Sequence, residues 1–169
     1  VWHHGRVRGG GLHWPMARPV SGRCRMSENA PLIIRGRCVV PGVAEAQALV
    51  THDRISGWGG IDSRTGQVVE VRHQLRGQSF AGKVLLFPGA KGSSGWSAAF
   101  HMARLMGVAP AAMLFKEMTT KVALGAVVTR APAMTDFDRD PFECIETGDW
   151  VVVNATQGQI QVFKKGASQ

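Results

Sequence analysis

Apolar residues in this chain fall into short runs, many of them followed by glycine or proline, which predicts many short elements rather than a few long ones. Strands are predicted at 32–40, 44–50, 67–71 and 111–115. The run at 83–87 is almost continuously apolar, as in a strand buried on both faces, and Pro88 ends it. The first half of the chain is therefore expected to be rich in strands.

Helical spacing appears once the chain has passed this buried strand. Apolar residues recur at helical intervals over 98–106, and Gly107 is a typical C-terminal stop. The segment 122–128 predicts a short buried helix, and 138–145 predicts a short acidic helix. Between these two helices, Met134 begins a stretch that we expect to be irregular.

The chain ends in two alternating runs, 150–154 and 159–163, which predict a β-hairpin around a polar turn. Strands come first, strands and helices alternate in the middle, and the hairpin closes the chain. This order predicts an α/β domain whose mixed, partly parallel sheet has flanking helices. There are no internal repeats that would indicate a solenoid.

A glycine- and serine-rich loop at 89–97 separates the buried strand from the first helix. Such loops lie at the carboxyl ends of strands, where ligands bind in α/β sheets, and a helix N-terminus favours anions. Gly92 allows close backbone approach, Ser93 and Ser94 supply hydroxyls, and Lys91 supplies a cation. The loop predicts an anion-binding site that could carry catalysis; the alternative is that Ser94 or Ser97 only caps the helix.

Other motifs with a known chemistry are absent or less specific. The chain has no P-loop, no nucleophile elbow of the G-x-S-x-G type and no GxGxxG fingerprint. The segment Trp58-Gly59-Gly60 with Asp62 is a second candidate for the active-site face. It contacts substrate or another subunit, or else it is an aromatic side chain packed over a tight glycine turn.

Charge is concentrated at the start of the chain. The 169 residues carry a formal charge of +8, which invites nucleic-acid binding as a hypothesis. However, residues 1–25 contain five arginines and no acidic residue, and the rest has 15 basic and 12 acidic side chains. We therefore expect Met26 to be the native initiator and 1–25 to be an untranslated or disordered leader. A near-neutral domain at 26–169 predicts no nucleic-acid partner.

Cysteine and histidine usage predicts no disulfide framework and no metal site within this chain. Cys24, Cys38 and Cys144 are far apart and odd in number, and His52, His73 and His101 lack the spacing of metal ligands. The remaining histidines lie within residues 1–25. The chain has neither a secretory signal nor an apolar stretch of membrane-spanning length. A cytoplasmic protein with no membrane association is expected.

The order of the motifs is more specific than any one of them. They occur as one colinear series over roughly 33–163: PGVAEA (41–46), WGGID (58–62), TG (65–66), RHQLRGQS (72–79), AGKVL (81–85), KGSS (91–94), GVAPAA (107–112), LGA (124–126) and TGD (147–149). This series resembles the small, swivel-domain subunit of the aconitase X family of hydro-lyases.

The resemblance implies a swivelling β/β/α domain that works with a large catalytic subunit. That subunit would carry an iron or iron–sulfur centre, and this chain would bind no cofactor itself. The family's proton acceptor is the serine after the glycine of its G-S-[ST] motif, which here is Ser93, with Gly92 and Ser94 expected to bind substrate. Unpaired N–H groups at the helix N-terminus would stabilise an ionised Ser93 and hold a carboxylate.

Family members dehydrate cis-3-hydroxy-L-proline in bacteria or mevalonate 5-phosphate in archaea. We expect the first substrate, because the sequence shows no phosphate clamp beyond Lys91. The alternatives are a mevalonate 5-phosphate dehydratase small subunit and a non-catalytic anion-binding domain.

Some positions depart from the family pattern. Aconitases place an arginine after the serine pair, but here Gly95 and Trp96 follow it, so a carboxylate clamp must come from elsewhere. Trp96 stands where relatives have a small residue, and we expect it to narrow the pocket.

Overall fold

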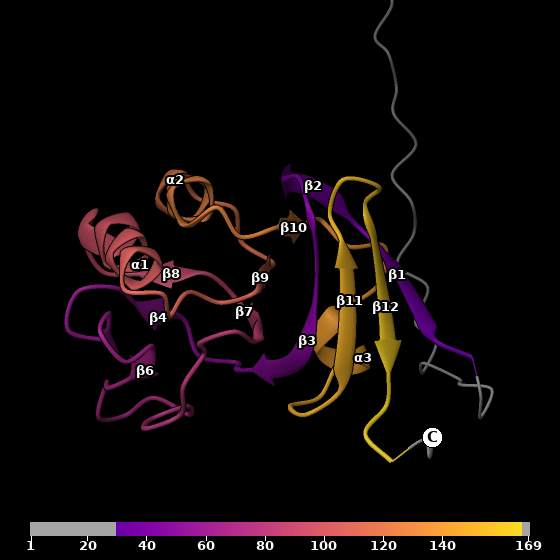
Figure 1. The fold of residues 1–169 in the computed structure, drawn as a ribbon, viewed down its shortest axis with the longest axis horizontal. Helices are drawn as coiled ribbons and strands as arrows, with labels where there is room; N and C mark the ends of the chain where they lie inside the picture. Colours follow the sequence, from indigo (N-terminus) through magenta and orange to yellow (C-terminus); the bar gives the residue numbers. More distant parts are fainter. Residues whose placement is uncertain (1–29, 167–169) are drawn as a thin grey trace, which may run out of the picture.

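The computed structural model describes residues 30–166, so the predicted leader and the expected start at Met26 lie outside it (Figure 1). The chain forms twelve strands and three helices within this range. In chain order they are β1 (Leu32–Arg35), β2 (Arg37–Val40), β3 (Val43–Val50), β4 (Ile55–Ser56), β5 (Ile61–Asp62), β6 (Gln67–Val68), β7 (Val84–Phe87), β8 (Ala90–Lys91), α1 (Gly95–Leu105), β9 (Ala112–Phe115), α2 (Thr120–Thr129), β10 (Ala133–Thr135), α3 (Pro141–Cys144), β11 (Trp150–Asn154) and β12 (Gln159–Phe163).

Eight strands form one mixed sheet in the order β1-β12-β11-β3-β7-β9-β10-β2. Strands β3, β7, β9 and β10 run parallel to their neighbours in this group, while β1, β2, β11 and β12 pair antiparallel. The two outermost strands, β1 and β2, are halves of one chain segment separated only by Gly36. The sheet therefore curls until its two edges meet at Gly36, whose N–H donates to the Gly158 carbonyl at 3.0 Å.

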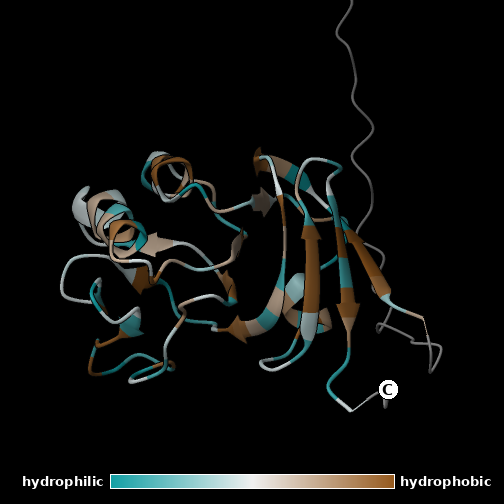
Figure 2. Ribbon diagram, in the orientation of Figure 1, coloured by the Kyte–Doolittle hydropathy of each residue, from teal (hydrophilic) through white to brown (hydrophobic). Residues whose placement is uncertain are grey.

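Apolar residues on the two faces of this sheet form two separate cores. Along β7, Val84 and Leu86 belong to the cluster inside the curled sheet, and Leu85 and Phe87 belong to the cluster between the sheet and the helices. All four side chains are fully buried, which confirms the prediction of a strand covered on both faces. Figure 2 shows hydrophobic residues along β1, β11 and β12, which line the inner cluster.

Helices α1 and α2 pack side by side on the outer face of the parallel strands (Figure 1). Both were predicted, as were β3, β7, β9 and the terminal hairpin, with ends shifted by a few residues. No helix between residues 30 and 166 is long and apolar enough to cross a membrane.

Four predictions of local structure were wrong or incomplete. The segment from Met134 is not irregular: Ala133–Thr135 forms β10, which is fully buried beside β9. The strand at 67–71 ends after Val68, because the chain turns there and Val69 N–H bonds to the Gly60 carbonyl at 2.9 Å. The acidic helix is a single turn, Pro141–Cys144, and the run 32–40 is split at Gly36.

Candidate functional site

The serine-rich loop leaves the carboxyl end of β7 and enters the first turn of α1. Between them, the short strand β8 pairs in parallel with β4, which places Lys91 opposite Ser56. Gly92, Ser93 and Ser94 follow directly and are exposed. The structure thus places the predicted loop at the sheet edge where α/β domains bind ligands.

Gly92 gives the loop its sharp turn. Its φ of +84° lies in the left-handed region that side chains disfavour, and a Cβ there would lie 3.3 Å from Ser56 Oγ. The Gly92 carbonyl accepts a hydrogen bond of 2.5 Å from Nζ of Lys121, in the first turn of α2. The loop is therefore fixed from one side by β4 and from the other by α2.

Ser93 presents its hydroxyl at the very start of α1. Its Oγ accepts a long bond of 3.4 Å from the Gly95 N–H, and its carbonyl accepts one of 3.3 Å from the Trp96 N–H. The first turn of α1 contains no acidic side chain, so nothing in it neutralises the positive end of the helix. An anion at Ser93 would meet a favourable electrostatic environment.

The capping alternative does not account for Ser94 and Ser97. Ser94 occupies the N-cap position, but its backbone is helical and its side chain makes no capping hydrogen bond. Ser97 Oγ donates to the Ser94 carbonyl at 3.4 Å instead of accepting from a helix N–H. Neither Ser94 nor Ser97 therefore caps α1 through its side chain.

The two lysines that flank the loop differ in their counter-ions. Lys91 pairs with Glu70 Oε1 at 2.5 Å. Lys121 forms no ion pair with any residue in the described range, and its ammonium donates to the Gly92 carbonyl. Lys121 thus brings a positive charge without a neighbouring carboxylate to the loop.

The second candidate segment lies against the first. Trp58 is 81% exposed. A Cβ built on Gly95 would lie 3.9 Å from Cβ and Cε3 of Trp58 and 3.4 Å from Ser93 Oγ, so Trp58 and Ser93 both lie beside Gly95. The interpretation of a packed aromatic side chain is therefore wrong. Asp62 has a structural role instead: its carboxylate accepts from the Arg64 N–H and the Thr65 hydroxyl, which lowers its pKa.

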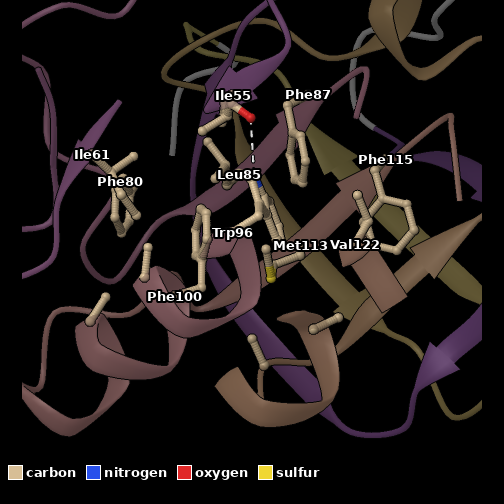
Figure 3. Packing of buried hydrophobic residues seen from close by; sticks show 14 of the residues in the cluster. Ile55, Ile61, Phe80, Leu85, Phe87, Trp96, Phe100, Met113, Phe115 and Val122 are labelled. Atoms are coloured by element: carbon tan, nitrogen blue, oxygen red, sulfur yellow. Dashed lines mark hydrogen bonds between the residues drawn. The ribbon is translucent and has the colours of Figure 1, made fainter. Parts of the chain in front are cut away.

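Trp96 does not narrow the pocket, contrary to the prediction. It is fully buried and packs against Phe87 and Phe100 in the outer core (Figure 3). Its Nε1 donates to the Ile55 carbonyl at 3.0 Å, so the ring is fixed away from the loop. The sequence gives the position of Trp96 two residues after Ser94, but it does not predict that α1 directs the Trp96 side chain into the core.

Three further residues lie near the loop, namely Glu70 and His73, in the turn after β6, and Lys121. The sequence predicts no site role for Glu70 or Lys121, and His73 stands out in it only as a histidine without ligand spacing. A signal existed for Glu70, because it is a lone carboxylate between Val69 and Val71. Lys121 offered none, because lysine at the start of a helix is ordinary.

A separate hollow lies at the same edge of the sheet and is lined by His52, Lys116, Glu117, Asp140 and Phe142. Its lysine, Lys116, is already paired with Asp140 at 2.7 Å, and the lining Glu117 accepts from Arg54 at 2.6 Å. Burial alone would raise the pKa of Asp140, but hydrogen bonds from Lys116 and the Phe142 N–H hold it below its usual value. The hollow therefore has less to offer an anion than the serine loop.

No group of three His, Cys, Asp or Glu side chains between residues 30 and 166 is placed to hold a metal ion. The residues present therefore do not fit an iron centre, and its location on a partner subunit stays a prediction.

Residues 33–162 match the family model described as the aconitase X swivel domain. Among curated proteins, the phosphomevalonate dehydratase small subunit of Methanosarcina mazei is 40% identical over 139 residues, covering 82% of this chain and 96% of the relative. The corresponding subunit of Archaeoglobus fulgidus is 41% identical over 128 residues, covering 76% and 96%. The colinear motif series therefore detected the right relationship.

Solved structures agree. The crystal structure of aconitase X from Thermococcus kodakaraensis in its holo-form superposes with a TM-score of 0.73 at 34% identity, covering 78% of this chain and 98% of the other. A second structure, determined by solution NMR, gives a TM-score of 0.70 at 41% identity, covering 78% and 99%. The expected fold class is confirmed.

Proposed function

Because the chain belongs to the aconitase X swivel domain family, we propose that it is the small subunit of a dehydratase acting on mevalonate 5-phosphate, with Ser93 as its proton acceptor. It supplies the serine loop to an active site completed by a large subunit. The observation that carries this proposal is the exposed Ser93 hydroxyl at the positive end of α1, on a loop fixed by Gly92 and Lys121.

Two lines of support favour mevalonate 5-phosphate over cis-3-hydroxy-L-proline. Relatives that are 34–44% identical carry the name phosphomevalonate dehydratase small subunit. The argument for hydroxyproline was that only Lys91 was available for a phosphate. Lys121 removes that argument, because its ammonium stands at the loop without a carboxylate partner in the described range.

The geometry fits proton abstraction next to a carboxylate. In mevalonate 5-phosphate, the carbon beside the carboxylate loses a proton and the neighbouring carbon carries the hydroxyl. Ser93 Oγ takes the proton, the electrons of the C–H bond form the double bond, and the neighbouring C–O bond breaks as hydroxide leaves. The chain's own contribution is to favour the ionised serine through the Gly95 N–H, the helix N-terminus and Lys121.

The test is coexpression of this chain with an aconitase X large subunit, followed by assays of dehydration. We expect the complex to dehydrate mevalonate 5-phosphate, and each chain alone to be inactive. Cis-3-hydroxy-L-proline serves as the comparison substrate. Turnover of that substrate alone would replace the proposed one, and turnover of neither by an intact complex would refute the assignment as a dehydratase of these substrates.

A further inference from the structure

Lys91, at the base of the Ser93 loop, is held by an ion pair with Glu70. The Nζ–Oε1 distance is 2.5 Å, and the side chains are 42% and 26% exposed. Lys91 directly precedes Gly92, so its placement sets where the turn to Ser93 begins. The pair is more sheltered than an ordinary surface salt bridge, whose long side chains retain most of their freedom.

The backbone fixes Glu70 on both sides. Its N–H donates to the Gly60 carbonyl at 3.2 Å, and its own carbonyl accepts from the His73 N–H at 3.2 Å. The second carboxylate oxygen, Oε2, is buried and has no hydrogen-bond partner. Leaving a buried carboxylate oxygen unpaired costs free energy, and such costs are concentrated at functional sites. Lys91 is the side chain that compensates the charge of Glu70.

His73 is the third member of this cluster. Only 5% of the residue is exposed, and its Nδ1 accepts from the Leu75 N–H at 3.0 Å, which puts the proton of the neutral ring on Nε2. Nε2 is buried without a partner. Burial lowers the pKa of His73, and the charge of Lys91 lowers it further. The charges of Asp53 and Glu70 act in the opposite direction but do not outweigh burial. A neutral His73 leaves Lys91 as the cation that holds Glu70.

We propose that Glu70 is a positioning residue for Ser93 that acts through Lys91. It holds the Lys91 ammonium in one place and so fixes the chain as it enters the Gly92 turn. It also neutralises Lys91, which leaves Lys121 as the loop cation available to an anionic substrate. This inference rests on the proposed function.

A double-mutant cycle in the complex with the large subunit tests the inference. Glu70→Gln removes the charge at constant shape and is expected to lower kcat at least about 10-fold, because small misplacements of a reacting group are costly. KM for mevalonate 5-phosphate is expected to change less than about 3-fold, because Glu70 does not touch substrate. Lys91→Met is expected to lower kcat by a similar factor, and Lys91→Arg to restore part of it.

The decisive variant is Glu70→Gln combined with Lys91→Met. If Glu70 acts only through Lys91, the pair is no slower than Lys91→Met alone. Glu146→Gln is the matched control, because Glu146 also pairs with a lysine, Lys164 at 3.4 Å, but belongs to the turn before β11. It is expected to change kcat less than about twofold, as for most surface substitutions away from a site. Melting temperatures of all complexes separate misfolding from misplacement.

Four results would overturn the inference. Multiplying effects in the double variant, or an unchanged kcat in Glu70→Gln, overturn this inference while an active wild-type complex preserves the proposed function. A loss in Glu70→Gln that is matched by a lower melting temperature and a raised KM shows a merely structural role and overturns it as well. A wild-type complex that does not act on mevalonate 5-phosphate overturns both together.

Discussion

At the scale of single residues, His73 shows how burial of one ionisable group makes stability depend on pH. Burial lowers its pKa below the ordinary 6.5, although Asp53 and Glu70 act in the opposite direction. The unfolded chain therefore binds more protons than the folded chain just below pH 6.5. Stability contributed by neutral His73 is complete above that pH and is lost as the pH falls from 6.5 towards the folded value.

We expect the melting temperature to fall between pH 7 and pH 5, and to fall less in a His73→Gln variant. Thermal unfolding followed by circular dichroism at several pH values measures both slopes. Asp62 and Asp140 do not affect the slope between pH 7 and pH 5. Their pKa values are lowered below 3.8, so the stability that they contribute is lost only at lower pH. Equal slopes in the two proteins would contradict the role given to His73.

Ser93 and Trp96 show what single residues reveal in advance. Ser93 lies between a strand and a helix, and the order strand, loop, helix could be predicted from the sequence. Its position in the loop before α1 could therefore be predicted too. The direction of Trp96 did not follow, because it depends on α2: the ring packs where Gly125 has no side chain. Contacts between distant residues, such as Lys91 with Glu70, were likewise outside the reach of a sequence pattern.

At the scale of elements, the close packing of α1 on α2 depends on Gly125. A Cβ built there would lie 2.1 Å from Cζ3 of the Trp96 ring, a rigid group anchored by its bond to the Ile55 carbonyl. Alanine is a better helix former than glycine, yet the clash is larger than that gain of about 1 kcal/mol. This crossing holds the start of α1, and with it the serine loop, in place.

Gly125→Ala is expected to lower the free energy of unfolding by about 1–3 kcal/mol, as overpacking of a core does. Urea denaturation of the variant and the parent measures the difference. Val127→Ala is the control on the same helix: its side chain is 55% exposed, and its change is expected to stay within about 1 kcal/mol. A Gly125→Ala variant as stable as the parent would show that the helices separate at no cost.

The elements that the sequence predicted well are those with a strong local pattern. Strand β7 and the hairpin β11–β12 have continuous or alternating apolar runs bounded by turn residues. Strand β10 was not predicted because its three residues, Ala133–Thr135, contain only one large hydrophobic side chain. They form a strand because they pair with β9 and β2, which are distant in the sequence. The break at Gly36 was not predicted because it depends on the whole sheet: the strands on either side of it, β1 and β2, pair at opposite edges.

At the scale of the whole molecule, the chain combines a curled eight-stranded sheet with one exposed serine loop, to which we assign the proposed catalytic role. The eight-stranded sheet and its two cores hold β7, β8 and α1, and these place Ser93 on the surface instead of inside a pocket of the chain's own. If Ser93 is the proposed base, its exposure means that a second surface is needed to exclude water and bind substrate. This is the arrangement expected of half an active site, and it agrees with relatives that are named small subunits.

The most direct test of this account is the turnover of mevalonate 5-phosphate by the two-subunit complex carrying Ser93→Ala. Removal of the proton acceptor is predicted to lower kcat at least about 1000-fold, while the complex assembles with unchanged mass. Ser97→Ala, four residues along and bonded only to the Ser94 carbonyl, is the control and is predicted to stay within about twofold of wild type. A Ser93→Ala complex that keeps more than about a tenth of the wild-type kcat would contradict the assignment of Ser93 as the base.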